Sequence, residues 1–260
     1  MAETGLHVLQ LMHTLVTLEF RFREAANVYV SGNLLFYYQE GNPHRRVAPD
    51  VFVVWGVSKE MRRNYKLWEE KQAPQVVIEI TSKETQKEDM GKKRALYERI
   101  GVAEYYLFDL DGDYLDPPLC GYQLVDHKYV QRPVKKLFPP LYGTMTMPMS
   151  AKEEGMWSLD SSAICWRLIS ERLKLQLWAL PTGKPDWRFV LRFYDPAERR
   201  WLVDSTQAWV ESEHFENPIY ENEELLRVVQ ARQTAEAEIV QLKTEIEKLR
   251  GKSASNQSEK

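Results

Sequence analysis

Residues 74–106 read PQVVIEITSKETQKEDMGKKRALYERIGVAEYY. The run VVIEI has the β-branched composition of a central strand, and the later run AEYYLFDL predicts a second strand. The polar and basic segment between them predicts a helix, which Gly101 is expected to end. A helix that connects two strands in this way favours parallel pairing of the strands. We therefore predict an α/β core built around this segment.

The rest of the chain predicts a mixed, partly antiparallel sheet flanked by helices. Residues 6–26 have the spacing of an amphipathic helix, with an apolar stripe of Leu6, Leu9, Met12, Leu15, Leu18 and Phe22. The runs LLFYY and VAPDVFVVWGV predict strands before residue 74, and GYQLVDHKYVQRP predicts a hairpin after it. Another hairpin is expected around Asp195-Pro196. Residues 1–215 are predicted to form this domain, with the Pro- and Met-rich residues 139–165 as an inserted loop.

The C-terminal part of the chain has a different composition. Apolar positions there alternate spacings of three and four, which predicts a coiled-coil helix over residues 221–250. These positions are Leu225, Val228, Arg232, Ala235, Ile239, Leu242, Ile246 and Leu249, with Arg232 as a polar break. Such a helix would form a homodimer, and the alternative is a single helix that packs on its own domain. Residues 251–260 are predicted to be a disordered tail.

The composition excludes several classes of protein. The hydrophobic content of 43% is enough for a sizeable core, and the net charge of −3 provides no overall basic field for nucleic acid. Cys120 and Cys165 alone form neither a disulfide framework nor a zinc site, and they fit a reducing cytosol. No apolar run approaches the roughly 20 residues that span a bilayer. The N-terminal sequence lacks the basic region of a signal peptide, so a cytoplasmic protein without a membrane segment is expected.

Two carboxylates occupy strand positions in this sequence. Asp50 follows a proline and opens the run VFVV, and Glu79 interrupts an otherwise apolar run. Burial of a carboxylate is costly unless it is paired or binds a metal. Two such groups at adjacent strand ends can hold Mg²⁺, or Mn²⁺ in its place, and the backbone carbonyl of Ile80 can add a ligand. The alternatives are that Asp50 caps a strand end and that Glu79 is a buried ion-pair partner.

The helix that follows carries a candidate basic group. Asp89, Lys93 and Tyr97 are spaced four residues apart and share one helix face, and Gln86 lies on roughly the same side. A lysine on this face can position a water molecule or stabilise charge on a phosphate. Lys92 lies about 100° around the helix and is less suitable. The alternative is an exposed, solvent-screened Asp89–Lys93 pair.

The strand itself lacks a lysine next to Glu79. Side chains repeat every two residues along a strand, so Thr81 lies on the same face as Glu79. A Glu-x-Lys arrangement would have lysine where Thr81 stands. The basic group must come from elsewhere, and Lys93 is the candidate. Two acids and one base in this order suit a metal-dependent phosphodiesterase.

The combined motifs resemble those of a known family. They are Pro49-Asp50, Glu79-Ile80-Thr81-Ser82, Asp89-x3-Lys93-x3-Tyr97 and Gly101-Val102-Ala103-Glu104-Tyr105. In this combination they are similar to the PD-(D/E)XK nuclease superfamily and, more narrowly, to the Uma-two family of restriction endonucleases. The likeness covers roughly residues 6–210.

The resemblance implies a restriction-endonuclease-like fold and a Mg²⁺-dependent endonuclease that hydrolyses phosphodiester bonds of DNA. It implies that Asp50 and Glu79 are metal ligands and that Lys93 replaces the lysine missing at Thr81. Ser82 matches the family serine, and Gln86, Asp89 and Tyr97 are supporting candidates. Two alternatives remain open at this point: a catalytically inactive binding module with the nuclease fold, and a coiled-coil adaptor.

Overall fold

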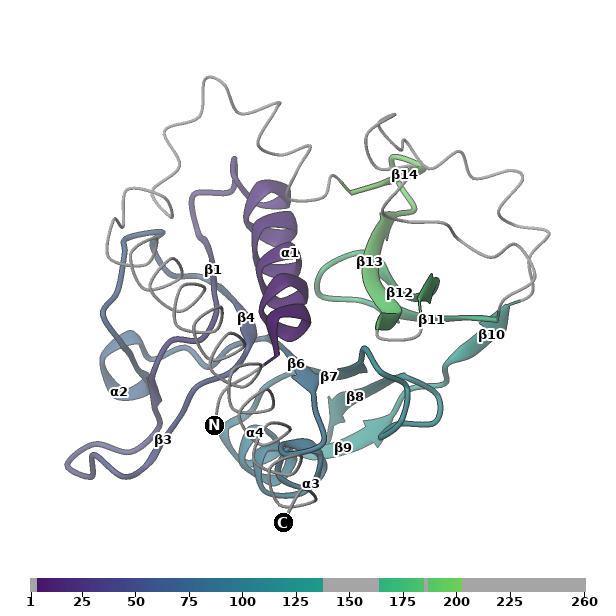
Figure 1. Cartoon of the computed structure of the whole chain (residues 1–260). Helices are drawn as coiled ribbons and strands as arrows, with labels where there is room; N and C mark the ends of the chain where they lie inside the picture. Colours follow the sequence, from purple (N-terminus) through teal and green to yellow (C-terminus); the bar gives the residue numbers. More distant parts are fainter. Residues whose placement is uncertain (1–3, 138–163, 185–186, 203–260) are drawn as a thin grey trace, which may run out of the picture. The chain divides into compact units, whose positions relative to one another are not determined.

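A six-stranded mixed sheet carries the segment 74–106 at its centre (Figure 1). The computed structural model describes residues 4–137, 164–184 and 187–202. The strand order is β1-β4-β6-β7-β8-β9. These strands are β1 (Val28–Ser31), β4 (Val51–Trp55), β6 (Val76–Thr81), β7 (Glu104–Asp109), β8 (Leu119–Val125) and β9 (Lys128–Gln131). All six residues of β6 and all six of β7 are buried, as expected for central strands.

The crossover between β6 and β7 confirms the predicted parallel pairing. Val76 pairs with Glu104 and Thr81 with Asp109, whereas the other strand pairs of this sheet are antiparallel. The connecting helix is divided into α3 (Gln86–Glu88), a π-helical turn (Asp89–Lys93) and α4 (Arg94–Ile100). It ends at Gly101, whose φ of 86° is the left-handed conformation that glycine adopts easily.

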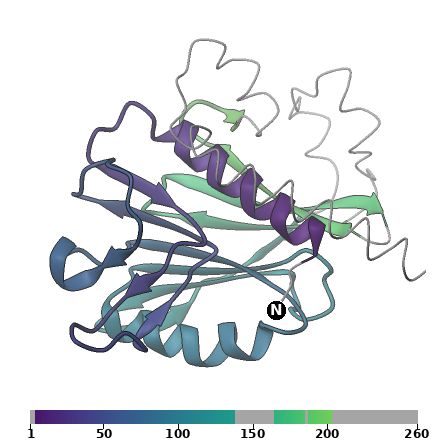
Figure 2. The same ribbon diagram turned by 60° about the vertical axis from the view of Figure 1, so that its left-hand side comes forward.

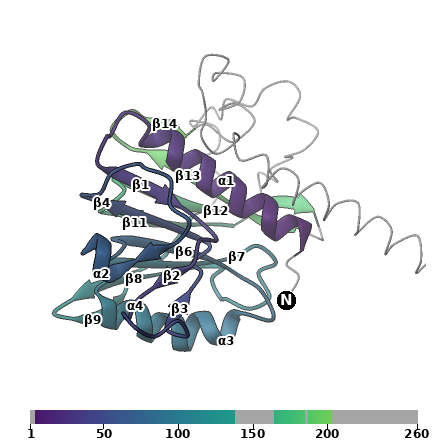
Figure 3. The same ribbon diagram turned by 90° about the vertical axis from the view of Figure 1, so that its left-hand side faces the viewer.

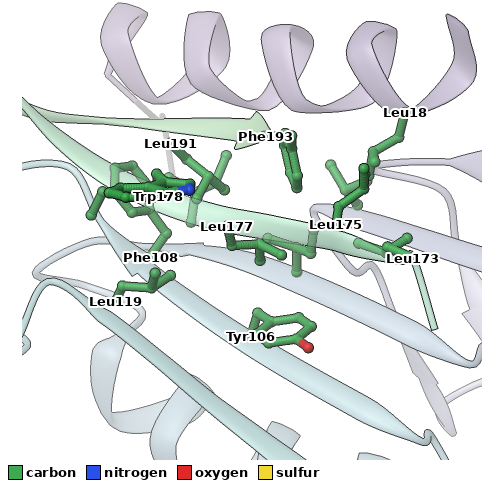
Figure 4. Close-up of a cluster of buried hydrophobic side chains, with 14 of the residues drawn as sticks. Leu18, Tyr106, Phe108, Leu119, Leu173, Leu175, Leu177, Trp178, Leu191 and Phe193 are labelled. Atoms are coloured by element: carbon green, nitrogen blue, oxygen red, sulfur yellow. The ribbon is translucent and has the colours of Figure 1, made fainter. Parts of the chain in front are cut away.

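A second, five-stranded antiparallel sheet packs against the first. Its strands are β10 (Lys135–Leu137), β11 (Cys165–Ser170), β12 (Leu175–Lys184), β13 (Trp187–Asp195) and β14 (Arg200–Trp201). The buried side chains between the two sheets form the main core, and Figure 4 shows Tyr106 and Phe108 of β7 facing Leu175 and Leu177 of β12. The hairpin predicted around Asp195-Pro196 is confirmed by the pairing of β13 with β14.

Helix α1 (Gly5–Arg21) and the α3–α4 segment lie on opposite sides of the six-stranded sheet (Figures 2 and 3). The helix ends five residues earlier than predicted, because Phe22 is its C-cap. Its buried face contains Leu11, Leu15 and Leu18, whereas Leu9 is 49% exposed. The predicted stripe was therefore wrong at Leu9: burial follows contact with both sheets and not the apolar spacing alone.

A small three-stranded sheet lies beside β4, in the order β3-β2-β5, and the chain then forms α2 (Leu67–Glu70). Its strands are β2 (Phe36–Tyr37), β3 (Arg46–Val47) and β5 (Tyr65–Lys66). The predicted LLFYY strand is thus only two residues long. Its aromatic residues pack with those of the large sheet: the ring centroid of Phe52 in β4 lies 6.4 Å from that of Phe36 and 5.8 Å from that of Tyr65. This second core lies on the α4 side and includes Tyr97 and Tyr105.

The remaining sequence predictions are resolved only in part. The hairpin GYQLVDHKYVQRP is confirmed by β8 and β9, which Asp126 and His127 join with φ angles of 48° and 62°. Cys165 begins β11, so the last residue of the predicted 139–165 loop is strand, and residues 139–163 lie outside the described part. The coiled-coil helix 221–250 and the tail 251–260 also lie outside it.

Neither Cys120 nor Cys165 forms a disulfide. Within the described ranges, no helix is long and apolar enough to cross a membrane.

The buried side chain of Gln10 links α1 to the second sheet. Its buried amide accepts a hydrogen bond from the backbone N–H of Leu191 (3.0 Å) and donates one to the Leu191 carbonyl oxygen (3.3 Å). Replacement of Gln10 by Ala leaves both buried groups without these partners, so we expect a loss of about 2 kcal/mol in the free energy of unfolding. Urea denaturation measures it, and Leu9→Ala on the exposed side is the control. Equal stability of the two variants would contradict the prediction.

Candidate functional site

Asp50 and Glu79 lie next to each other on two neighbouring strands of the sheet. Asp50 directly precedes β4, and Glu79 lies in β6, which pairs with β4 in antiparallel register with Val51 opposite Ile78. The backbone N–H of Asp50 donates a hydrogen bond to Oε2 of Glu79 (3.3 Å). Sheet pairing therefore brings together two carboxylates that are 29 residues apart in the sequence.

Glu79 is fully buried and both of its carboxylate oxygens have partners. Its Oε1 accepts a hydrogen bond from the Tyr97 hydroxyl (2.7 Å), and its Oε2 lies 3.0 Å from Nζ of Lys93. Lys93 and Tyr97 are one helical turn apart, so they reach the strand from the same helix face, as the sequence spacing predicts. A buried carboxylate needs such partners to offset the cost of desolvation.

Asp89 is the second carboxylate that contacts Lys93. Its Oδ1 lies 2.9 Å from Nζ of Lys93, and its Oδ2 accepts a hydrogen bond from the Thr81 hydroxyl (3.4 Å). The Asp89 side chain is only 1% exposed, so the alternative of a solvent-screened surface pair is wrong. Asp89 and Lys93 are the two ends of the π-helical turn, a deviation that often occurs at functional sites. Lys92, in contrast, is exposed.

Backbone contacts fix the position of Asp50. Its Oδ2 accepts a hydrogen bond from the backbone N–H of Ile80 (2.7 Å), and its carbonyl oxygen accepts one from the N–H of Asn33 (3.2 Å). Gly32 lies directly against this carbonyl oxygen, where a Cβ atom would collide with backbone. The close approach of two chain segments therefore requires glycine at position 32.

Ser82 and Gln86 form the turn that begins the helix. The N–H of Ser82 donates a hydrogen bond to the Thr85 hydroxyl (3.1 Å), and the Ser82 carbonyl accepts one from the N–H of Gln86 (2.9 Å). These contacts turn the chain from β6 into α3. The structure thus gives Ser82 a local role that the sequence does not reveal, and it places the Gln86 backbone in the same turn.

A family model described as "Uma2: Putative restriction endonuclease" matches residues 2–152, which is more than half of the chain. The chain belongs to the Uma2 family. The matched region contains Asp50, Glu79 and Lys93, and the predicted resemblance to the Uma-two family is confirmed. By the description of its model, the Uma2 family is one of restriction-endonuclease-like nucleases.

Comparison with solved structures finds one described as "a putative nuclease belonging to DUF820" from Anabaena variabilis. It is 13% identical in sequence, and the match covers 55% of the Uma2 chain and 77% of the other chain, with a TM-score of 0.38. Comparison with curated proteins finds no match. Membership of the Uma2 family therefore follows from the match to the family model.

Charge and burial oppose each other in this Uma2 site. The pKa of Glu79 is raised to about 8: burial is the main cause, the ammonium of Lys93 opposes it, and the charges on Asp50 and Asp89 add to the rise. Burial would lower the pKa of Lys93, but these three carboxylates raise it above its ordinary value. The site therefore combines three carboxyl groups with one ammonium group, an arrangement that favours a further cation.

Carboxylate oxygens, which this site contains, are the ligand type that hard divalent cations prefer. In the part of the chain that the structure describes, no group of three or more His, Cys, Asp or Glu side chains has the arrangement of a metal site. Mg²⁺, however, is commonly held by one or two carboxylates and keeps several water molecules. Asp50 and Glu79 provide two carboxylates, and only 13% of the Asp50 side chain is exposed. The predicted role of the Ile80 carbonyl stays a prediction; the N–H of the same residue binds Asp50.

The sequence pattern does not single out His7, which also lies at this site. Its Nε2 is 3.6 Å from Oδ2 of Asp50, and the residue is 3% exposed. One signal was available: His7 precedes Leu11, Leu15 and Leu18 at helical spacing, so a polar ring occupies the N-terminal end of the buried face.

Proposed function

We propose that this Uma2 protein is a Mg²⁺-dependent DNA endonuclease of the PD-(D/E)XK type. The observation that carries the proposal is the convergence of Asp50, Glu79 and Lys93 from three separate segments, with Nζ of Lys93 3.0 Å from Glu79. Membership of a family of restriction-endonuclease-like nucleases supports DNA as the substrate.

Asp50 and Glu79 would hold the metal ion, with Mn²⁺ as a substitute for Mg²⁺. Such an ion would supply Lewis-acid chemistry at this site, polarising the scissile phosphate and lowering the pKa of a water molecule. The ammonium of Lys93 stabilises the negative charge that develops on the phosphate, or holds the attacking water in line. The lysine comes from the helix and not from the strand position of Thr81, and the two residues are linked through Asp89.

Three further residues position these groups. Asp89 holds Lys93 at 2.9 Å and in turn accepts the hydrogen bond of Thr81, so the threonine in the lysine slot supports the lysine that replaces it. Tyr97 fixes one oxygen of Glu79 at 2.7 Å and leaves the other toward Asp50 and Lys93. Buried hydrogen bonds of this type hold a ligand in one orientation.

One observation favours a second candidate function, a catalytically inactive binding module. Both oxygens of Glu79 already have protein partners, so this carboxylate can be satisfied as a structural ion pair without a metal. Metal titration separates the two functions: an inactive module is expected to bind neither Mg²⁺ nor Mn²⁺ at millimolar concentration.

The proposed function is tested with the purified full chain on supercoiled, linear and single-stranded DNA. We expect cleavage with Mg²⁺ or Mn²⁺ and none in excess EDTA. Because metal stabilisation of charge supplies several kcal/mol and about 1.4 kcal/mol is a factor of ten, the double variant Asp50→Ala, Glu79→Ala is expected to be at least about 1000-fold slower. Equal cleavage by the wild type and the double variant would show that a contaminating nuclease is responsible and would reject the proposal.

A further inference from the structure

Helix α1 brings an imidazole to the carboxylate of Asp50. Nε2 of His7 lies 3.6 Å from Oδ2 of Asp50, and the His7 side chain is 4% exposed. This separation is longer than a hydrogen bond, but it places the ring within electrostatic range of the carboxylate. Contacts in ligand-free active sites are often long and shorten in the functional complex.

The position of His7 is fixed by the rest of α1. Its backbone N–H donates to the Thr4 hydroxyl (3.2 Å), which caps the helix. Further along, Gln10 binds both backbone groups of Leu191 in β13. The helix is therefore attached to the second sheet close to His7, and the ring has little freedom to move away from the site.

The two oxygens of Asp50 have different surroundings. Oδ2 accepts the hydrogen bond of the Ile80 N–H (2.7 Å) and is the atom that faces His7. When two groups hold Oδ2, the carboxylate is fixed in rotation and Oδ1 is the oxygen available to a metal ion. A carboxylate fixed in this way loses less conformational entropy when it binds an ion.

We propose that His7 is a positioning residue of the nuclease site: it donates the Nε2 hydrogen to Oδ2 of Asp50 and holds Oδ1 in place for the metal ion. This inference rests on the proposed function. An apolar side chain would fill the buried position on α1 without the cost of burying a polar ring, and the nearby carboxylate of Asp50 is a group that offsets this cost.

The test measures Mn²⁺ binding to the full chain by calorimetry. Loss of a group that orients a metal ligand weakens binding about 10- to 100-fold, so His7→Leu is expected to raise the Kd for Mn²⁺ by at least about tenfold. His7→Gln keeps an N–H donor on a side chain of similar length and is expected to restore most of the affinity. His44→Gln, in an exposed turn, is the matched control and should bind like the wild type. Wild-type affinity in His7→Leu would overturn the proposal.

A second measurement needs no metal. The ¹⁵N signals of the His7 ring are compared in the wild type and in Asp50→Asn, with the signals of His44 as reference. We expect the Nε2 signal of His7 to shift in the variant, whereas an unchanged signal would overturn the contact. If the wild type binds no Mn²⁺ at all, the proposed function and the metal part of this proposal both fail, and the ring signals still decide whether His7 contacts Asp50.

Discussion

Replacement of Lys93 by Met is expected to lower the rate of DNA cleavage about 100- to 1000-fold, the usual cost of removing one group that stabilises charge in a transition state. The methionine keeps the apolar stem of the side chain and removes the ammonium that lies 3.0 Å from Glu79 and 2.9 Å from Asp89. Mn²⁺ binding should persist, because Asp50 and Glu79 remain. Cleavage under single-turnover conditions and calorimetry measure the two effects separately.

Lys92 provides a matched control for this experiment. It is the neighbouring lysine on the same π-helical turn, but it is exposed. Lys92→Met is expected to cleave at close to the wild-type rate at low ionic strength. Lys93→Gln, which keeps an N–H donor without the charge, serves if Lys93→Met does not fold. Similar losses in the Lys92 and Lys93 variants would indicate general attraction of DNA by positive charge and would contradict the specific role of Lys93.

Replacement of Glu104 by Leu is expected to lower the free energy of unfolding by at least about 3 kcal/mol, since each buried donor left without a partner costs about 1 to 3 kcal/mol. Glu104 is 3% exposed at the start of β7. Its carboxylate accepts hydrogen bonds from the hydroxyl groups of Tyr106 and Ser170 and from the backbone N–H groups of Glu171 (2.9 Å) and Arg172 (3.1 Å). These contacts join β7 to the turn after β11.

Urea denaturation of the full chain measures this loss. The control is Glu171→Ala, because the Glu171 side chain is 54% exposed and forms an ion pair with Arg132 at the surface, which contributes little. A loss in Glu104→Leu no larger than in Glu171→Ala would mean that the two sheets are held together by their apolar core alone. The Mn²⁺ affinity of the folded fraction should be unchanged, because Glu104 lies at the far end of β7 from the site. It pairs with Val76, whereas Asp109 at the other end pairs with Thr81.

Local rules were sufficient to predict much of the site. Strand alternation places Glu79 and Thr81 on the same face of the strand. Helical spacing places Lys93 and Tyr97 on the same face of the helix. The crossover rule makes β6 and β7 parallel, so the helix must return over the sheet toward Glu79. Local rules do not place the strand of Asp50 beside that of Glu79; the sequence interpretation assumed this adjacency, and the pairing of β4 with β6 provides it.

Long-range packing decided which side chains are buried, and local rules do not contain this information. Helical spacing left open whether Asp89 supports the site or forms an exposed pair with Lys93; contact of the helix with the sheet buries Asp89, which accepts hydrogen bonds from Thr81 and Tyr105. Leu9 fits an apolar stripe, yet it is half exposed because α1 contacts two sheets and not one. Burial depends on which elements pack together, and no local window of sequence contains that information.

The sequence by itself determined the order of acid, acid and base, the parallel pair of strands and the helix face that carries Lys93. These follow from backbone periodicity and chain connectivity, which act over a few residues. Only the tertiary structure decided that His7 reaches Asp50, that Asp89 is buried and that Glu104 joins two sheets. These contacts link residues up to 68 positions apart, and they exist because the two sheets and α1 bury a common core.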